Sequence, residues 1–356
     1  MHIKSNGWSV YKIMVLYLGA VIGAGFASGQ EILQFFIVFG AEGIMGVALA
    51  TLLFGYLGGL VMILAVTAGS SNYSDIYMKI LGNIPGRAMD ILSTAMLPGG
   101  LLVMLAGGGA VFSEHLGLPG FAGTALIALV TIMALSGGLQ GVVSVNAVLV
   151  PLKVVVILLI CVITLIYSAN STEYGSGGAV SHGSRVNWAW SAILYVSYNM
   201  VVPLAVLSSL GKSVPLRAGL AGGLLGGVML GAVVAVVTVA GLRFYPAITG
   251  YEVPLLFIAG HLGNAVKTAL GFLIWLAILT TAIAEAHGFA SRFARPDSKK
   301  YRLIGIGTVL LALPASSLKF SDLVAVLYPL FGYAGLVLLF ALLFIAPARF
   351  IRRNFF

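Results

Sequence analysis

Residues 19–31 read Gly19-Ala20-Val21-Ile22-Gly23-Ala24-Gly25-Phe26-Ala27-Ser28-Gly29-Gln30-Glu31 and lie inside the first apolar run of the chain, residues 9–38. Glycine costs about 1 kcal/mol relative to alanine inside a helix, and this stretch has four glycines followed by a carboxylate. We therefore expect a membrane helix whose hydrogen bonding lapses around Gly23. Irregular backbone at this depth persists only where protein buries it or where it lines a cavity. The alternative is that the glycines only allow neighbouring helices to pack closely.

A second interruption is expected in the run 187–210, where Ser197-Tyr198-Asn199-Met200-Val201-Val202-Pro203 places a proline four residues after Asn199. Proline has no N–H, so the carbonyl of Asn199 loses its helical donor and the helix is expected to kink or unwind there. Freed amides at such breaks can bind an anionic group, and freed carbonyls can bind a cation. Two breaks at corresponding places favour a binding site between them over two tolerated kinks.

The composition is that of a protein that crosses a membrane many times. Of its 356 residues, 60% are hydrophobic and 8% are charged, against about 25% charged in a typical soluble protein. A helix needs roughly 20 apolar residues to cross about 30 Å of hydrocarbon, and ten runs approach or exceed that length, of which the ninth is the shortest. The runs are 9–38, 43–68, 89–112, 119–137, 141–167, 187–210, 215–241, 267–291, 302–316 and 322–346.

The chain divides at its longest polar segment, residues 168–186. Five runs precede this segment and five follow it, and an odd number in each half gives the two halves opposite orientations. We therefore expect an all-α polytopic membrane protein with a five-plus-five inverted repeat. Residues 1–167 would form the first repeat, 168–186 an external loop, 187–346 the second repeat, and 347–356 a basic cytoplasmic tail.

The net charge of +9 reflects membrane orientation better than nucleic acid binding, because the basic residues lie in short loops between apolar runs. Most of the 19 lysines and arginines face the cytoplasm if the N-terminus does, so the positive-inside rule places both termini there. The first run also has the outline of a signal peptide ending at Ala27-Ser28-Gly29, but its length, Lys12 and its continuation to Val38 favour a retained helix. Cys161 has no partner cysteine for a disulfide or a metal site.

The string Val21-Ile22-Gly23-Ala24-Gly25-Phe26 resembles the Ile-Gly-x-Gly-Ile-Phe signature in the first helix of permeases of the amino acid–polyamine–organocation superfamily, which have the LeuT fold. The longer string from Val21 to Glu31 is most similar to the YkvI-type bacterial permeases, and the similarity extends over nearly the whole chain. This resemblance implies a secondary transporter in the bacterial cytoplasmic membrane that moves an amino acid or similar small zwitterion by alternating access, coupled to a cation. The alternative is a receptor or sensor that has the same fold and does not transport.

The resemblance also implies a substrate site. The substrate carboxylate would meet backbone amides at the first break, around Gly23, Ala24, Gly25 and Phe26, and the facing break would contribute Tyr198 and Asn199. This sequence departs from that signature by having Phe26-Ala27-Ser28 where many permeases continue with Ile-Phe, a difference at the expected substrate pocket.

Two groups of residues are candidates for coupling transport to an ion. Ala277-Ile278-Leu279-Thr280-Thr281 is similar to the Ala-x-x-Thr-Ser/Thr pattern that, with carbonyls corresponding to Gly19 and Ile22, forms a sodium site in sodium-coupled members. The alternative is that both hydroxyls bond back to their own helix. No other metal and no cofactor are expected.

Lys153 is the second candidate. It follows Gly141 by about 18 Å of helix, which places it near the middle of the membrane, where a lysine costs about 2.5 to 3.5 kcal/mol and calls for a function or a partner. It also matches a lysine of proton-coupled permeases, which favours protons over sodium. The alternative is a fixed structural pair with Glu31 or Glu285.

Glu31 and Glu285 are the other carboxylates in apolar runs and are candidate gate residues. Glu31 would either stabilise the start of a second half-helix or bind the substrate directly. Glu285 would either reach toward the cytoplasmic surface or line an inner gate. Gly211-Lys212-Ser213 lacks the first glycine of a phosphate-binding loop, since Val206 stands in its place, and no enzyme motif is found elsewhere in the sequence. We expect no enzymatic activity, and the sequence leaves the oligomeric state open.

Overall fold

The computed structural model describes residues 6–69, 82–137, 140–168, 187–296 and 298–347. Within these ranges the chain is helical and has no strand. The predicted external loop lies outside the described residues from 169 onward, and the predicted tail lies outside them from 348 onward. The division into two repeats at these boundaries therefore stays a prediction.

Each of the ten apolar runs forms helix, and the first run is divided. It forms α1 (Asn6–Val21), α2 (Ala24–Ser28) and α3 (Gln30–Phe35), followed by the short η1 (Ile37–Phe39). The rest of the first half consists of α4 (Ala41–Ala68), α6 (Asn83–Leu116), α7 (Gly120–Gly137) and α8 (Gln140–Ser168).

The second half begins with α9 (Trp188–Asn199) and α10 (Val201–Ser208), which together correspond to one run. It continues with α11 (Leu216–Leu242), η2 (Ala247–Gly250), α12 (Pro254–Gly260), α13 (Asn264–Phe293), α14 (Lys299–Ala312), η3 (Pro314–Ser317), α15 (Phe320–Phe340) and η4 (Ala341–Ile345). The sequence analysis did not anticipate η2 and α12, which lie between the seventh and eighth runs. Among the described residues, seven helices are long and apolar enough to cross a membrane, and α14, with 14 residues, is shorter.

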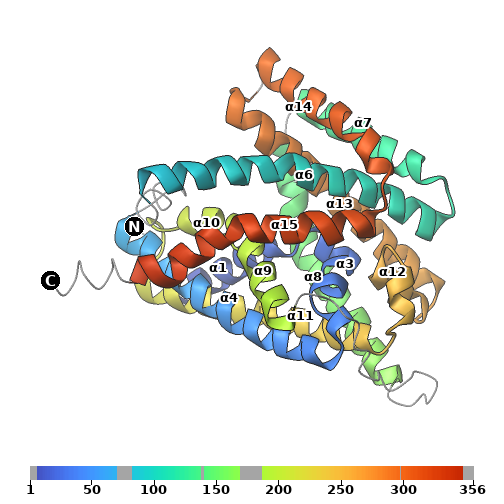
Figure 1. The fold of residues 1–356 in the computed structure, drawn as a ribbon, viewed down its shortest axis with the longest axis horizontal. Helices are drawn as coiled ribbons and strands as arrows, with labels where there is room; N and C mark the ends of the chain where they lie inside the picture. The colour runs from blue at the N-terminus through green and yellow to red at the C-terminus, as the bar shows by residue number, and fades with distance from the viewer. Residues whose placement is uncertain (1–5, 70–81, 138–139, 169–186, 297, 348–356) are drawn as a thin grey trace.

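Helices that hold the same position in each half pack against one another. α4 packs along α11, α6 packs along α13, and α7 lies beside α14. Figure 1 shows α6 and α15 side by side across the bundle, with α7 and α14 projecting together from its upper side and α12 on its right-hand side. This pairing is the one expected when two inverted repeats interlock.

A stripe of glycines explains how closely α4 and α11 approach. Gly223, Gly227 and Gly231 recur every four residues and are expected to form one face of a helix. A Cβ atom added at Gly223 or Gly227 would overlap the backbone of α4, and one added at Gly231 would overlap Thr51. In a bilayer, small residues favour helix association because backbones can then pack closely.

Large apolar side chains cover much of the outside of the bundle. On five different helices, leucine or phenylalanine side chains are more than half exposed: Leu52, Leu129, Leu159, Phe272 and Leu311. A soluble monomer rarely exposes apolar surface on this scale, whereas lipid tails solvate it well. The surface therefore agrees with the prediction of a membrane protein.

Candidate functional site

The first helix is broken at Ile22 and Gly23. α1 ends at Val21, and α2 begins at Ala24 after Gly23 adopts an extended conformation with φ −83° and ψ −164°. A further change of direction follows at Gly29, whose φ of 85° is strained for any residue with a side chain. The expected interruption is therefore present. It isolates α2 as a five-residue segment in which Ala24, Gly25 and Phe26 are buried.

The second break is a kink rather than an unwound segment. Only Met200 separates α9 from α10, and it keeps helical dihedral angles. Its N–H donates to the carbonyl of Val196 at 3.0 Å, and its carbonyl accepts from the N–H of Leu204 at 3.1 Å. Pro203 thus removes a single helical donor, as expected, and the helix continues around the gap.

Glu31 connects the two breaks. It lies in the first turn of α3 and is only 4% exposed. Its Oε2 accepts a hydrogen bond of 2.7 Å from the hydroxyl of Tyr198, and its carboxylate also interacts with the backbone amide of Phe26. A Cβ atom added to Gly25 would overlap Oε1 of Glu31. The side chain therefore folds back over α2 and reaches α9. Its negative charge also lies in the first turn of α3, where a carboxylate stabilises the start of a helix.

Aromatic rings close around this carboxylate. The ring of Tyr198 has its centroid 5.7 Å from Phe35, 5.7 Å from Tyr195 and 5.3 Å from Tyr328. The hydroxyl of Tyr328 lies 2.6 Å from the position that a Cβ atom of Gly25 would take. Sequence reasoning did not identify Phe35, Tyr195 or Tyr328, because single aromatic residues in apolar helices carry no motif.

Some polar atoms near the breaks have no partner among the described residues. Tyr195 and Gln30 are buried, and neither the hydroxyl of Tyr195 nor Oε1 of Gln30 forms a hydrogen bond. Asn199 is also buried, and its Nδ2 is likewise unpartnered. Buried polar groups are normally hydrogen-bonded, so unsatisfied ones close to a helix break are consistent with a place that a ligand or water occupies.

Lys153 lies on α8 and is 4% exposed. It interacts electrostatically with Glu31, but the two do not form an ion pair within the part of the chain that the structure describes. α8 packs close to α1, since Val150 would lie 3.0 Å from a Cβ atom added at Gly19. Lys153 and Glu31 therefore attract each other across a gap, without the contact that a fixed structural pair would make.

The two threonines of α13 bond within their own helix. The hydroxyls of Thr280 and Thr281 both donate to the carbonyl of Ala277, at 3.1 and 2.8 Å. α13 does pack against α2, next to Ile22, which is fully buried. In this arrangement both hydroxyls have carbonyl partners on their own helix.

Glu285 lies on α13 and faces α6. Its Oε1 lies 2.9 Å from the position of a Cβ atom added to Gly100, and it interacts electrostatically with Tyr328. Tyr328 interacts with Glu31 in the same way, so this tyrosine interacts with both candidate gate carboxylates. No hydrogen bond or ion pair to Glu285 is found among the described residues.

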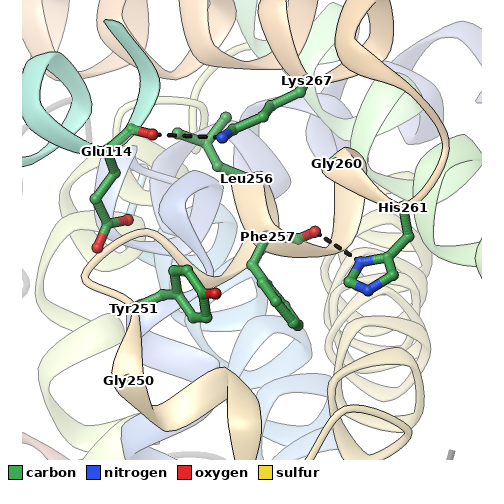
Figure 2. A pocket seen from close by; sticks show the side chains of 8 residues that line it. All are labelled: Glu114, Gly250, Tyr251, Leu256, Phe257, Gly260, His261 and Lys267. Atoms are coloured by element: carbon green, nitrogen blue, oxygen red, sulfur yellow. Dashed lines mark hydrogen bonds between the residues drawn. The ribbon is translucent and has the colours of Figure 1, made fainter. Parts of the chain in front are cut away.

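A separate hollow of about 410 Å³ lies beside α12 (Figure 2) and includes none of the predicted site residues. It is lined by Glu114, Gly250, Tyr251, Leu256, Phe257, Gly260, His261 and Lys267. The carboxylate of Glu114 accepts hydrogen bonds from the N–H groups of Glu252 at 2.6 Å and Val253 at 2.9 Å, and Lys267 donates to the carbonyl of Glu114 at 3.4 Å. These bonds fix the segment leading into α12 against α6 and α13.

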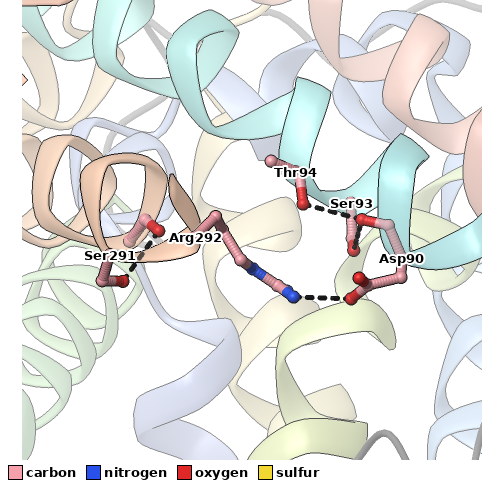
Figure 3. Close-up of polar contacts among 6 residues, drawn as sticks. Asp90, Ser93, Thr94, Ser291 and Arg292 are labelled. Atoms are coloured by element: carbon pink, nitrogen blue, oxygen red, sulfur yellow. Dashed lines mark hydrogen bonds and ion pairs between the residues drawn. The ribbon is translucent and has the colours of Figure 1, made fainter. Parts of the chain in front are cut away.

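The opposite ends of α6 and α13 are joined by an ion pair. Arg292 donates to Asp90 at 2.6 Å, and nearby hydroxyls of Ser93 and Thr94 donate to the carbonyl of Asp90 (Figure 3). The two charged side chains are 28% and 45% exposed, so the pair contributes between 0 and about 1 kcal/mol. α6 and α13 therefore run antiparallel with a polar contact near each end.

Comparison with known proteins gives two relatives of similar length. The chain is 27% identical over 340 residues to the uncharacterized membrane protein YkvI of Bacillus subtilis (strain 168), a match that covers 96% of each chain. It is 30% identical over 336 residues to the uncharacterized protein YyaD of the same organism, covering 93% of this chain and 95% of YyaD. No protein-family model matches the chain.

Two solved structures are similar in fold. MhsT in complex with L-phenylalanine has a TM-score of 0.57 and 18% identity, covering 94% of this chain and 96% of that one. A mutant of the manganese transporter of Eremococcus coleocola has a TM-score of 0.53 and 13% identity. The match covers 94% of this chain and 76% of the transporter chain.

The helix order, the broken first helix and these likenesses define a polytopic membrane protein with the LeuT fold, as the sequence predicted. Because the chain is 30% identical to YyaD over nearly its whole length, it belongs to the family of YkvI and YyaD.

Proposed function

We propose that this protein is a secondary active transporter of an amino acid or a similar small zwitterion. The observation that carries the proposal is the buried hydrogen bond from Tyr198 to Glu31, which joins two helix breaks in a fold known from transporters. The structure of MhsT with L-phenylalanine supports the choice of substrate class, although it concerns a distant relative in fold. The break at Ile22 and Gly23 separates α2 and α3 from α1, so these short helices have a point about which they can tilt, as alternating access requires.

We further propose that protons rather than sodium ions drive transport. Lys153 is buried close to Glu31 without an ion pair between them, and the hydroxyls of Thr280 and Thr281 have carbonyl partners on their own helix. A buried lysine can hold its proton with different affinity in two conformations, which is the requirement for coupling.

Reconstitution in proteoliposomes tests the transport proposal. A gradient of pH, acid outside, is expected to drive accumulation of at least one radiolabelled amino acid above its equilibrium level, and an ionophore that collapses the gradient is expected to abolish it. Protein-free liposomes are the control. Binding to the purified protein without accumulation in the liposomes would instead indicate a receptor or sensor.

We also propose that the protein lies in the bacterial cytoplasmic membrane with both termini in the cytoplasm. The excess of basic residues in the loops assigned to the cytoplasm supports this orientation. A cysteine introduced by Ser176→Cys, in a background with Cys161→Ala, is expected to react with a membrane-impermeant maleimide in whole cells. Labelling only after permeabilisation would reverse the orientation, and the Cys161→Ala protein alone gives the background.

A further inference from the structure

The carboxylate at the first helix break belongs to the protein itself. Oε1 of Glu31 takes the space beside Gly25, and the carboxylate interacts with the backbone amide of Phe26. These are the amides to which the resemblance assigned a substrate carboxylate. With Glu31 in this position, the place for an anionic group is already filled by a side chain that is covalently part of the site.

A negative group on a ligand would face a like charge here. Glu31 is buried, and charges interact more strongly in surroundings of low polarity than in water. A ligand carboxylate beside Glu31 would therefore be repelled, whereas an ammonium group would be attracted and could donate up to three hydrogen bonds. Among the described residues, the side-chain hydrogen bond to Glu31 comes from the neutral hydroxyl of Tyr198, which an ammonium can replace.

The surroundings of Glu31 also suit an organic cation. The ring of Tyr198, whose hydroxyl donates to Glu31, packs against the rings of Phe35 and Tyr328, and aromatic faces attract ammonium groups. The unpartnered Oε1 of Gln30 is a further buried acceptor close in sequence to Glu31. Tyr198, which donates to Glu31, is itself only partly buried.

The cation that attracts Glu31 does not form an ion pair with it. Lys153 interacts with Glu31 electrostatically, but the two form no ion pair within the described residues. Glu285, which also interacts with Tyr328, adds a second negative charge near the cluster when it is ionised. The balance of charge at the break therefore favours a cation that comes closer to Glu31 than Lys153 does.

We propose that the solute is recognised through a primary ammonium group that binds Glu31 between Tyr198 and Tyr328, and that a carboxylate on the solute is not required. The substrate class is then that of primary amines, including amino acids, with the amine as the recognised group. This inference rests on the proposed transport function and adds the chemical group that the site selects.

Matched ligands test this proposal on the purified full-length protein. Two sets are used: L-phenylalanine, phenethylamine and hydrocinnamate, and L-leucine, isoamylamine and isocaproate. Each set contains an amino acid, the same compound without the carboxylate, and the same compound without the amine. In at least one set, the amine is expected to bind as tightly as the amino acid or more tightly in isothermal titration, and the acid is expected not to bind. Stronger binding of the acid, or the lack of binding by both amines, would overturn the proposal.

Variants of Glu31 and its partner locate the binding group. Glu31→Gln keeps the shape of the side chain and is expected to weaken amine binding about tenfold or more, because a charge-assisted hydrogen bond is lost. Glu42→Gln removes an exposed carboxylate at the start of α4 and is expected to bind like the wild type. If Glu31→Gln does not fold, Tyr198→Phe serves instead: it keeps the charge of Glu31 and removes the hydrogen bond that the ammonium group has to displace, so amine binding should become tighter than in the wild type. Unchanged binding in Glu31→Gln, or unchanged or weaker binding in Tyr198→Phe, contradicts the assignment.

Uptake into proteoliposomes separates this inference from the transport proposal. If the amines bind in the expected pattern but neither amines nor amino acids accumulate, transport fails and the recognition of the ammonium group stands. If an amino acid accumulates while its amine neither binds nor competes for uptake, transport stands and the inference fails.

Discussion

Gly25→Val is expected to abolish solute binding and transport while leaving the protein inserted in the membrane. A Cβ atom at this position would overlap Oε1 of Glu31 and lie 2.6 Å from the hydroxyl of Tyr328. A valine side chain would therefore push the carboxylate away from α2 and break its bond to Tyr198. Overpacking of this kind costs typically about 1 to 3 kcal/mol, and the solute would lose both its carboxylate partner and its space. Isothermal titration and proteoliposome uptake measure the two losses.

Gly307→Val is the matched control for this experiment. Gly307 lies within α14, and a Cβ atom there would meet nothing within 4 Å. The same change of residue type in a helix should therefore leave binding and uptake at wild-type levels. A Gly25→Val protein that elutes as a single species in size-exclusion chromatography and binds solute normally would remove the first helix break from the site.

Lys153→Ala is expected to abolish accumulation driven by a pH gradient while retaining exchange of solute across the membrane. The lysine is 4% exposed and attracts Glu31 from α8, so its charge contributes to the electrostatics around the first helix break. Loss of the titratable group removes the difference in proton affinity between two conformations, on which coupling depends. Accumulation in acid-outside proteoliposomes should fall at least about tenfold, whereas counterflow of labelled against unlabelled solute should persist.

Lys299→Ala provides the comparison, because Lys299 is exposed at the start of α14 and far in sequence from the breaks. It should accumulate solute like the wild type. Uptake that depends on sodium and survives Lys153→Ala would make this lysine structural. The hydroxyls of Thr280 and Thr281, released from Ala277 in another conformation, would then be the place to search for the coupling ion.

The arrangement of Lys153, Glu31 and Tyr198 links the two proposals physically. Lys153 is the cation that interacts with Glu31 among the described residues, and the proposed ammonium group would bind the same carboxylate. A conformational change that moves Glu31 would therefore change the affinity for the solute and the affinity of Lys153 for its proton together. Under this scheme Glu31→Gln should reduce both amine affinity and coupling, whereas Lys153→Ala should reduce coupling and leave amine binding intact.

The helices and their breaks could be predicted from the sequence because they depend on local chemistry. An apolar run of sufficient length must pair its backbone groups within a helix when lipid surrounds it, which fixes the ten helical runs. Glycine and proline act at their own positions, because glycine adopts many backbone conformations and proline has no N–H to donate. The breaks at Gly23 and before Pro203 could therefore be predicted without any tertiary information. The cost of a charge in the membrane singled out Lys153, Glu31 and Glu285 in the same way.

The contacts that turn these elements into a site could not be predicted, because they depend on how distant helices pack. Tyr198 and Glu31 are separated by 167 positions, and no spacing rule connects them. Tyr328 comes from α15 and reaches Gly25 only because α15 packs against α3 and α9. The sequence by itself determined the membrane helices, their interruptions and the buried charges. The tertiary structure alone decided that a carboxylate of the protein fills the first break, because the direction of a side chain follows from the packing around it rather than from its neighbours in the chain.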